Sequence, residues 1–209
     1  MMKPLHHLSA SQLKTLSLCP RKWYFYHEGM KAEETDTTYL KCGSKVHESI
    51  ESHLNGNEMP DLSDDVNDVA KKHYFRCLDI YHELNIPEGG DVEKELKAIV
   101  NGVEIGGRMD YIAGNRIYDW KTGKPRSDDY IQAAVYQRLA RENGISDPKV
   151  IFVHLSSGTM RTMPDYPHDS VDALVQSALD IISTKAFMPR YGSHCRYCPY
   201  VRLCEEAEE

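Results

Sequence analysis

The chain has 209 residues, of which 41% are hydrophobic and 27% are charged, and its 32 acidic and 25 basic side chains give a formal net charge of −7. This length and composition predict one domain, 1–209, with a sizeable core. No apolar run approaches the roughly 20 residues of a membrane-spanning helix, so no membrane insertion is expected. The negative charge argues against broad, nonspecific adhesion to polyanions.

The first third of the chain is expected to be helical. Ser9, with Gln12 three residues later, forms a capping box that predicts a helix running toward Cys19. Helical periodicity predicts two further helices, over about 40–54 and 66–84. The first eight residues contain no sustained apolar segment of the secretory type, so a cytoplasmic, reducing location is expected.

Two hairpin patterns in the middle of the chain, Asn101-Gly102 and Gly114-Asn115, predict three successive antiparallel strands. Across a two-residue turn, paired residues have numbers that add up to the same total. This rule places Asp110 opposite Asp119, and Glu93 opposite Asp110, provided that neither hairpin contains a bulge. The sequence therefore predicts a row of carboxylates across one face of a meander.

Opposed carboxylates in this meander need a neutralising partner. Directly opposed Cβ atoms lie roughly 4.5–5.5 Å apart, where like charges are destabilising, and a divalent cation would neutralise them. Lys121 projects on the same face as Asp119, because side chains alternate along a strand. A bulge would favour Glu95, or neither glutamate, over Glu93. The alternative interpretation is that Asp119 and Lys121 form an ordinary surface ion pair.

Helices and strands continue beyond the meander. Ser127 is expected to cap a helix that holds Asp128 and Asp129 in its first turn and ends before Gly144. The remaining predicted elements are strands over 150–155 and 159–163 and a helix over 170–185.

Three of the six cysteines lie close together near the C-terminus, as Cys195, Cys198 and Cys204. In a reducing compartment such a group indicates metal binding rather than disulfides. Tetrahedral zinc and [4Fe-4S] clusters both accept four cysteines, so a fourth is expected from elsewhere in the chain. Two cysteines, Cys42 and Cys77, are expected to be core residues of helices.

Four motifs follow one another in a fixed order: Gly43-x3-His47-x3-Glu51, Gly107-x2-Asp110, Asp119-Trp120-Lys121-Thr122-Gly123 and Gln132-x3-Tyr136. Together they resemble the RecB-like branch of the PD-(D/E)xK nuclease superfamily, across nearly the whole chain. The resemblance implies an α/β fold of the restriction-endonuclease type, in which a central mixed sheet is flanked by helices.

The resemblance also implies roles for single residues. His47, Asp110, Asp119 and the backbone carbonyl of Trp120 would bind Mg²⁺ or Mn²⁺. Catalysis would involve Lys121 together with both carboxylates, supported by Gln132 and Tyr136, for which helix-to-sheet packing is the alternative interpretation. Two further acidic candidates are Glu93 and Glu51.

The segment around Cys19 resembles the N-terminal motif of iron-sulfur nucleases in this branch. By that resemblance Cys19, Cys195, Cys198 and Cys204 would hold a [4Fe-4S] cluster, with zinc as the alternative. Residues 1–30 and 186–209 would then form a cluster-binding lobe. Such a cluster would join the two ends of the chain and disfavour the unfolded state.

The resemblance implies a metal-dependent exonuclease that degrades single-stranded DNA, in the 5′-to-3′ direction, and trims DNA for CRISPR spacer acquisition beside the CRISPR integrase proteins. One alternative is a phage or cellular repair or recombination exonuclease; another is a non-catalytic, metal-stapled DNA-binding module. A homo-oligomer is a further expectation from some relatives. Any DNA path must be locally basic, and its candidate residues are Arg21, Lys22, Lys121, Lys124, Arg126, Arg196 and Arg202.

Overall fold

The computed structural model describes residues 7–33, 38–60, 62 and 67–206 of the chain. In chain order, its elements are β1 (His7–Ser9), α1 (Ala10–Leu18), α2 (Pro20–His27), α3 (Thr38–Leu54), α4 (Asp68–Glu83), β2 (Asp91–Val100), β3 (Val103–Ala113), β4 (Arg116–Lys121), α5 (Asp129–Glu142), β5 (Lys149–His154), β6 (Thr159–Thr162), α6 (His168–Thr184), the 3-10 turn η1 (Ser193–Tyr197) and α7 (Val201–Glu206). The predicted helix start at Val66 lies outside the described residues.

The predicted central mixed sheet is confirmed, and β3 is its central strand. β2 pairs antiparallel with β3 along almost its whole length, while β1 and β4 share the other edge of β3. β5 lies parallel to β4, and β6 is antiparallel to β5, so the described strands form one six-stranded sheet. This arrangement leaves the end of β4 between the middle of β3 and the end of β5.

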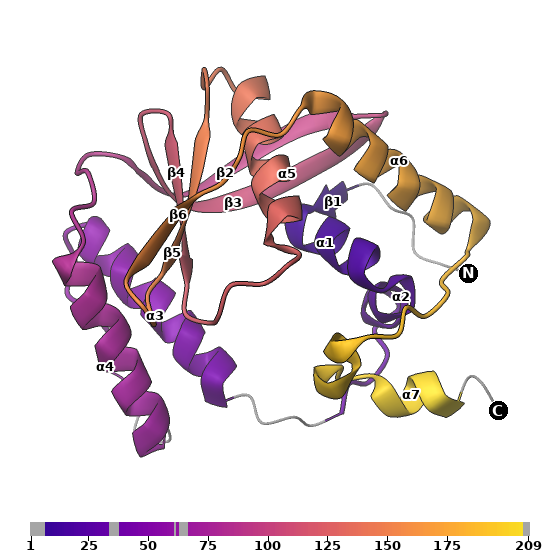
Figure 1. Ribbon diagram of the computed structural model, residues 1–209, viewed down its shortest axis with the longest axis horizontal. Helices are drawn as coiled ribbons and strands as arrows, with labels where there is room; N and C mark the ends of the chain where they lie inside the picture. Colours follow the sequence, from indigo (N-terminus) through magenta and orange to yellow (C-terminus); the bar gives the residue numbers. More distant parts are fainter. Residues whose placement is uncertain (1–6, 34–37, 61, 63–66, 207–209) are drawn as a thin grey trace.

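Helices cover both faces of this sheet (Figure 1). α1, α5 and α6 lie on one face, and α3 and α4 lie on the other. Successive side chains of each strand point to opposite faces of the sheet. In β4, Ile117 packs into the core beneath α5, while Tyr118 and Trp120 belong to the core beneath α3 and α4. The same alternation directs Asp119 and Lys121 toward the face of α5.

Local sequence signals account for most element boundaries. The capping box at Ser9 is present, with the Gln12 amide N–H donating to Ser9 Oγ and the Ser9 N–H donating to Gln12 Oε1. Asn101 and Gly102 have φ values of 50° and 80°, as the predicted two-residue hairpin requires. Both meander hairpins therefore have the expected register.

The predicted cap of α5 at Ser127 is wrong. α5 begins at Asp129, and its N-cap residue is Asp128, which makes no side-chain capping bond. The reason is that Asp129 itself accepts the Arg126 N–H at 2.9 Å, which holds the preceding residues in a turn.

No helix in the described part of the chain is long and apolar enough to cross a bilayer.

Candidate active site

The ladder between β3 and β4 ends where the predicted carboxylate pair begins. Tyr111 pairs with Tyr118, and Ile112 with Ile117, so the next position in this register joins Asp110 and Asp119. There the Trp120 N–H donates to Asp110 Oδ2 at 2.7 Å. A carboxylate thus replaces the strand as the hydrogen-bond partner, and it fixes the end of β4 at the site.

Asp119 is a buried carboxylate that is 3% exposed. Its Oδ2 lies 2.5 Å from Lys121 Nζ, and its Oδ1 accepts a hydrogen bond from Gln132 Nε2 at 2.8 Å. Burial, followed by the charge of Asp110, raises the pKa of Asp119 to about 6 against the opposing effect of Lys121. Apart from this ion pair, Oδ2 has no hydrogen-bond partner despite its burial, so it keeps a lone pair for a metal cation.

Gln132 and Tyr136 lie one turn apart on α5 and join the site through hydrogen bonds. Lys121 Nζ donates to Gln132 Oε1 at 2.8 Å, and Gln132 Nε2 donates to the Tyr136 hydroxyl at 2.8 Å. The hydroxyl in turn donates to the Arg108 carbonyl at 2.9 Å. This chain of hydrogen bonds fixes Lys121 between two strands and a helix. Gln132 and Tyr136 therefore make polar contacts with the site in addition to packing α5 against the sheet.

The two motif glycines allow the helices to approach the strands. A Cβ on Gly107 would lie 2.9 Å from a Tyr136 ring carbon, and a Cβ on Gly43 would lie 2.9 Å from Thr122 Oγ1. Gly107 therefore lets α5 pack close to β3. Gly43 lets α3 reach the end of β4, where His47 extends into the site from the other side of the sheet.

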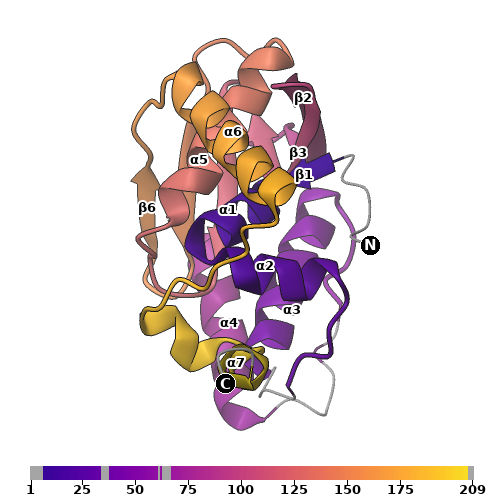
Figure 2. The same ribbon diagram turned by 90° about the vertical axis from the view of Figure 1, so that its right-hand side faces the viewer.

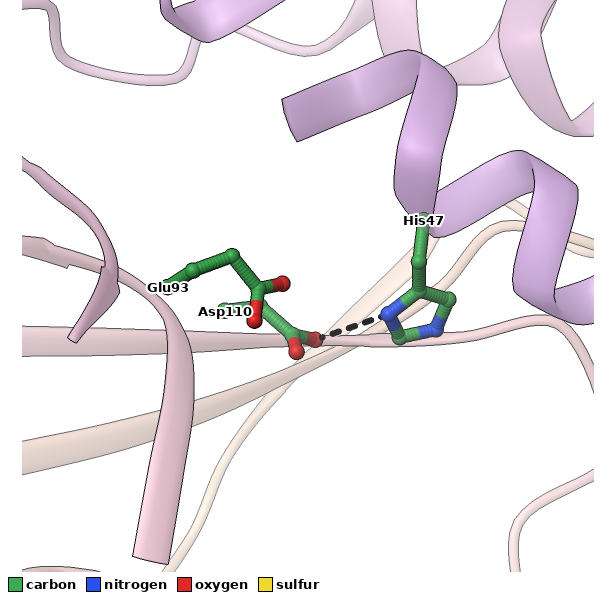
Figure 3. A group of neighbouring side chains, drawn as sticks. All are labelled: His47, Glu93 and Asp110. Carbon is green, nitrogen blue, oxygen red and sulfur yellow. Dashed lines mark ion pairs between the residues drawn. The ribbon is translucent and has the colours of Figure 1, made fainter. Parts of the chain in front are cut away.

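His47, Glu93 and Asp110 point toward one another (Figure 3). Their ligand atoms all lie within 4.8 Å of one another, and His47 Nδ1 is 3.4 Å from Asp110 Oδ2. Burial lowers the pKa of His47, but the hydrogen bond and charge of Asp110 outweigh it and raise the pKa. Asp119 lies outside this group of three, engaged by Lys121.

Glu93 has an unusual backbone. The β2–β3 ladder pairs Val92 with Tyr111 and Lys94 with Met109, but it skips the position of Glu93, whose φ is 50°. A non-glycine residue in this region is strained, and such strain concentrates at functional sites. The distortion accompanies a Glu93 carboxylate directed at Asp110.

The surroundings of Glu93 also decide between the two glutamate candidates. Its Oε2 lies 2.5 Å from Arg108 Nε, and burial, then the charge of Asp110, raises its pKa. Glu95, the alternative for a bulged hairpin, is exposed and pairs with Lys97 at 3.4 Å. The structure therefore places Glu93, not Glu95, at the site.

Two open cavities meet at this site and share His47, Asp110 and Thr122. The first, of about 410 Å³, is called the basic cavity because four of its lining residues are Lys14, Lys121, Lys124 and Arg126. The second, of about 540 Å³, is called the acidic cavity because its lining includes Glu48, Glu51 and Glu93. Glu51 thus borders the site but lies outside the group of three ligands.

Lys14 of the basic cavity was not expected from the sequence. It extends from α1, and its Nζ lies 2.8 Å from Asp129 Oδ1 on α5. The two residues are 115 positions apart, so no local motif could have indicated the contact.

Residues 7–205 match the PD-(D/E)XK nuclease superfamily. The chain belongs to this superfamily. A structural relative, described as "Putative exonuclease" from Eubacterium rectale, has a TM-score of 0.62 and 16% identity, covering 93% of this chain and 88% of its own. A second structural relative, SSO0001, has a TM-score of 0.55 and 16% identity, and the match covers 98% of this chain and 88% of that one. No curated protein sequence matches.

At these identities the two structures support the fold. Nucleases of the PD-(D/E)XK superfamily use divalent metals, and the site offers carboxylates and an imidazole for one. The residue roles given by the motifs remain predictions, and the backbone strain at Glu93 and the raised pKa of Asp119 can be tested by unfolding measurements.

Replacing Glu93 with glycine should stabilise the metal-free nuclease while weakening its metal site. Glycine adopts a φ of 50° without strain, so the free energy of unfolding should rise by about 1 kcal/mol. Urea unfolding in EDTA measures this change, and a Mn²⁺ titration measures the loss of affinity. Glu95→Gly is the matched control, expected to lose about 0.5–1 kcal/mol. Equal losses in both variants would contradict the assigned strain.

Replacing Asp119 with asparagine should stabilise the metal-free nuclease increasingly as the pH rises. The pKa of Asp119 is about 6 in the folded protein, against an ordinary value of 3.8. The folded state therefore binds the proton more tightly, and the stability that this contributes is lost as pH rises from about 4 through 6. Unfolding free energies of both proteins in EDTA between pH 4 and 7 should diverge. Parallel curves would contradict the raised pKa.

The four cysteines of the predicted cluster line one cavity of about 140 Å³ between α2 and the C-terminal segment, and they are Cys19, Cys195, Cys198 and Cys204. Cys19 is buried, and the other three are half-buried. The Glu33 N–H donates to the Pro199 carbonyl at 2.8 Å, and the rings of Phe25 and Tyr200 lie 5.7 Å apart. α2 and α7 accordingly lie on the same side of the molecule, the side that faces the viewer in Figure 2. Cys42 and Cys77 are buried in the α3–α4 core, as expected.

Proposed function

We propose that the protein is a divalent-metal-dependent nuclease that degrades single-stranded DNA from its ends. The observation that carries this proposal is the position of Lys121, which is held by Asp119 and Gln132 in the basic cavity, next to the Asp110 carboxylate where the two open cavities meet. A pair of carboxylates that lines open space, with Asp119 buried and Asp110 half-buried, can bind both a cation and an extended substrate.

The donor set fits a hard divalent cation. Carboxylate oxygens of Asp110, Glu93 and Asp119 suit Mg²⁺, and the imidazole of His47 extends the preference toward Mn²⁺. When bound, such a metal polarises the scissile phosphate and lowers the pKa of a bound water. These four side chains line the two cavities between them, so a phosphodiester can reach a metal bound there.

The protein's own residues then orient the reacting groups. Lys121 is an ammonium point charge that can stabilise the negative charge developing on the phosphate. Gln132 fixes Lys121 and Asp119 at the same time, because its amide oxygen accepts from Lys121 and its amide N–H donates to Asp119. Tyr136 restrains the Gln132 amide, and its burial raises its pKa well above the ordinary value, so it acts as a neutral hydrogen-bond donor.

Cleavage of end-labelled DNA tests the proposal. Single-stranded and double-stranded oligonucleotides would be incubated with anaerobically purified protein in Mg²⁺, Mn²⁺ or EDTA. Metal-dependent shortening of the single strand from one end is the expected result, and labels at either end give the polarity. Absence of cleavage with every metal and substrate would instead favour the DNA-binding module.

We propose a [4Fe-4S] cluster at the four cysteines. Zinc binds thiolates at about 2.3 Å, which places tetrahedral sulfurs roughly 4 Å apart. Among the described residues, the cysteine sulfurs form no group of three within 4.8 Å. They surround a cavity of about 140 Å³, close to the size of one that holds benzene. The choice of this cluster over zinc rests on the resemblance to iron-sulfur nucleases.

The biological role is proposed from the resemblance. Trimming of DNA for CRISPR spacer acquisition, 5′-to-3′ polarity, an integrase partner and a homo-oligomer all derive from relatives in the RecB-like branch. A phage or cellular repair exonuclease would use the same site chemistry. Co-purification of the tagged protein with an integrase from the same cells would distinguish the CRISPR role from the repair role.

A further inference from the structure

The two cavities at the active site differ in charge. The basic cavity has four basic side chains, of which Lys14, Lys121 and Arg126 are each paired with an aspartate, and the carboxylate that it adds to those of the active site is Asp129. Apart from His47, which both cavities share, the acidic cavity has one basic side chain, Arg108, against the carboxylates of Glu48, Glu51, Glu93 and the shared Asp110. A polyanion that crosses the site therefore meets attraction on one side and little on the other.

Two further glutamates of α3 complete the wall of the acidic cavity. Glu48 pairs with Lys45 at 2.6 Å, while Glu51 has no ion pair within the described ranges of the chain. Both lie on the same helix as His47, one residue and four residues beyond it. A phosphate that passed the site into this cavity would approach these carboxylates, and such like-charge contacts oppose binding.

The acidic cavity offers stacking surface in place of phosphate contacts. Tyr39 and Leu40, in the first turn of α3, line it and are 56% and 70% exposed. The Tyr39 ring meets the His73 ring edge-on at 6.2 Å. Exposed aromatic rings bind bases of single strands at about 1–3 kcal/mol per base. The cavity volume of about 540 Å³ is ordinary for a ligand of nucleotide size.

We propose, on the basis of the nuclease function above, that the cleft accepts DNA in one orientation: the intact strand lies along the basic cavity, and the terminal nucleotide occupies the acidic cavity with its base on Tyr39. The enzyme then requires a free end, because a strand that continued through the acidic cavity would bring further phosphates against Glu48 and Glu51. Preference for ends is thus a property of α3.

Circular single-stranded DNA tests this requirement. The wild type should degrade a linear strand and leave a circle of the same sequence intact. Glu48→Lys/Glu51→Lys should raise the ratio of circle to linear cleavage by about tenfold or more, because the obstructing charge becomes attractive. The matched control is Glu83→Lys/Glu88→Lys, which makes the same charge change at exposed positions outside both cavities.

A linear strand with an abasic terminal nucleotide tests the stacking contact. The wild type should cleave it about fivefold more slowly or worse than the normal strand, from the energy of one stacked base. Tyr39→Ala should cleave both strands at the same reduced rate, while Tyr39→Phe should behave as the wild type. Phe75→Ala, which removes an equally exposed ring of α4, is the control.

The outcomes separate this inference from the function on which it rests. Wild-type cleavage of circles as fast as linear strands, or an unchanged ratio in the Glu48→Lys/Glu51→Lys variant, would overturn the inference and leave the nuclease function standing. Failure of the wild type to cleave any DNA with either metal would overturn the function itself.

Discussion

Lys121→Ala should lower the rate of DNA cleavage by about 100- to 1,000-fold while DNA affinity stays within a few-fold. This is the usual effect of removing one group that stabilises charge in a transition state. Lys121 is suited to that task because Asp119, at 2.5 Å, and Gln132, at 2.8 Å, hold its ammonium group in place. Its loss also leaves the buried Asp119 without its cationic neighbour, so Asp119 would carry a proton at higher pH.

Single-turnover cleavage and fluorescence anisotropy with the same labelled strand separate the chemical step from binding. Lys149→Ala is the matched control: it removes a half-buried lysine that lies outside both cavities and pairs with Asp147 at 2.7 Å, and both rate and affinity should be retained. Lys121→Ala that cleaves at the wild-type rate would refute the proposed active site. Equal losses of rate and affinity would make Lys121 a binding residue.

Cys195→Ala should destabilise the protein by about 5 kcal/mol. A cluster that joins Cys19 to Cys195 closes a loop of more than 100 residues, and cross-linking of loops this long removes about that much chain entropy from the unfolded state. For a chain of this length, the midpoint of thermal unfolding should fall by roughly 10–20 °C. The contacts of α2 with the C-terminal segment should be lost together with the cluster.

Iron and acid-labile sulfide content, measured with thermal unfolding under anaerobic conditions, checks this expectation. Cys77→Ala is the control, since Cys77 is buried in the α3–α4 core and should leave the iron content unchanged. A Cys195→Ala protein with full iron content and stability would contradict the cluster assignment. Zinc in place of iron in the wild type would confirm the ligands and correct the cofactor.

The parts of the site set by short-range rules were predictable from the sequence. Two-residue hairpins fix the register, so the approach of Asp110 to Asp119, and of Glu93 to Asp110, followed from counting residues. The i, i+4 spacing of Gln132 and Tyr136 likewise placed both on one face of a helix. In each case the spacing of residues along the chain also determines which side chains lie next to one another.

Other features depend on packing between distant segments. Lys14 enters the basic cavity because α1 packs against α5, which no pattern within either helix indicates. The left-handed backbone of Glu93 interrupts a strand that has no glycine there, so propensity alone would continue the ladder. The start of α5 was misplaced by one residue because Asp129 bonds backward to Arg126.

The placement of α1 has a practical consequence for any laboratory that purifies this protein. α1 ends one residue before Cys19, and its Lys14 contacts Asp129 in the wall of the basic cavity. A nine-residue helix is a short, stiff rod of about 14 Å. Oxidation of the cysteines would therefore be transmitted through α1 to Lys14, and the expected effect is weaker binding of the proposed DNA substrate. If the proposed cluster is present, inactivity of an oxidised preparation would reflect loss of the cluster, and each measured rate should be reported with the iron content of its batch.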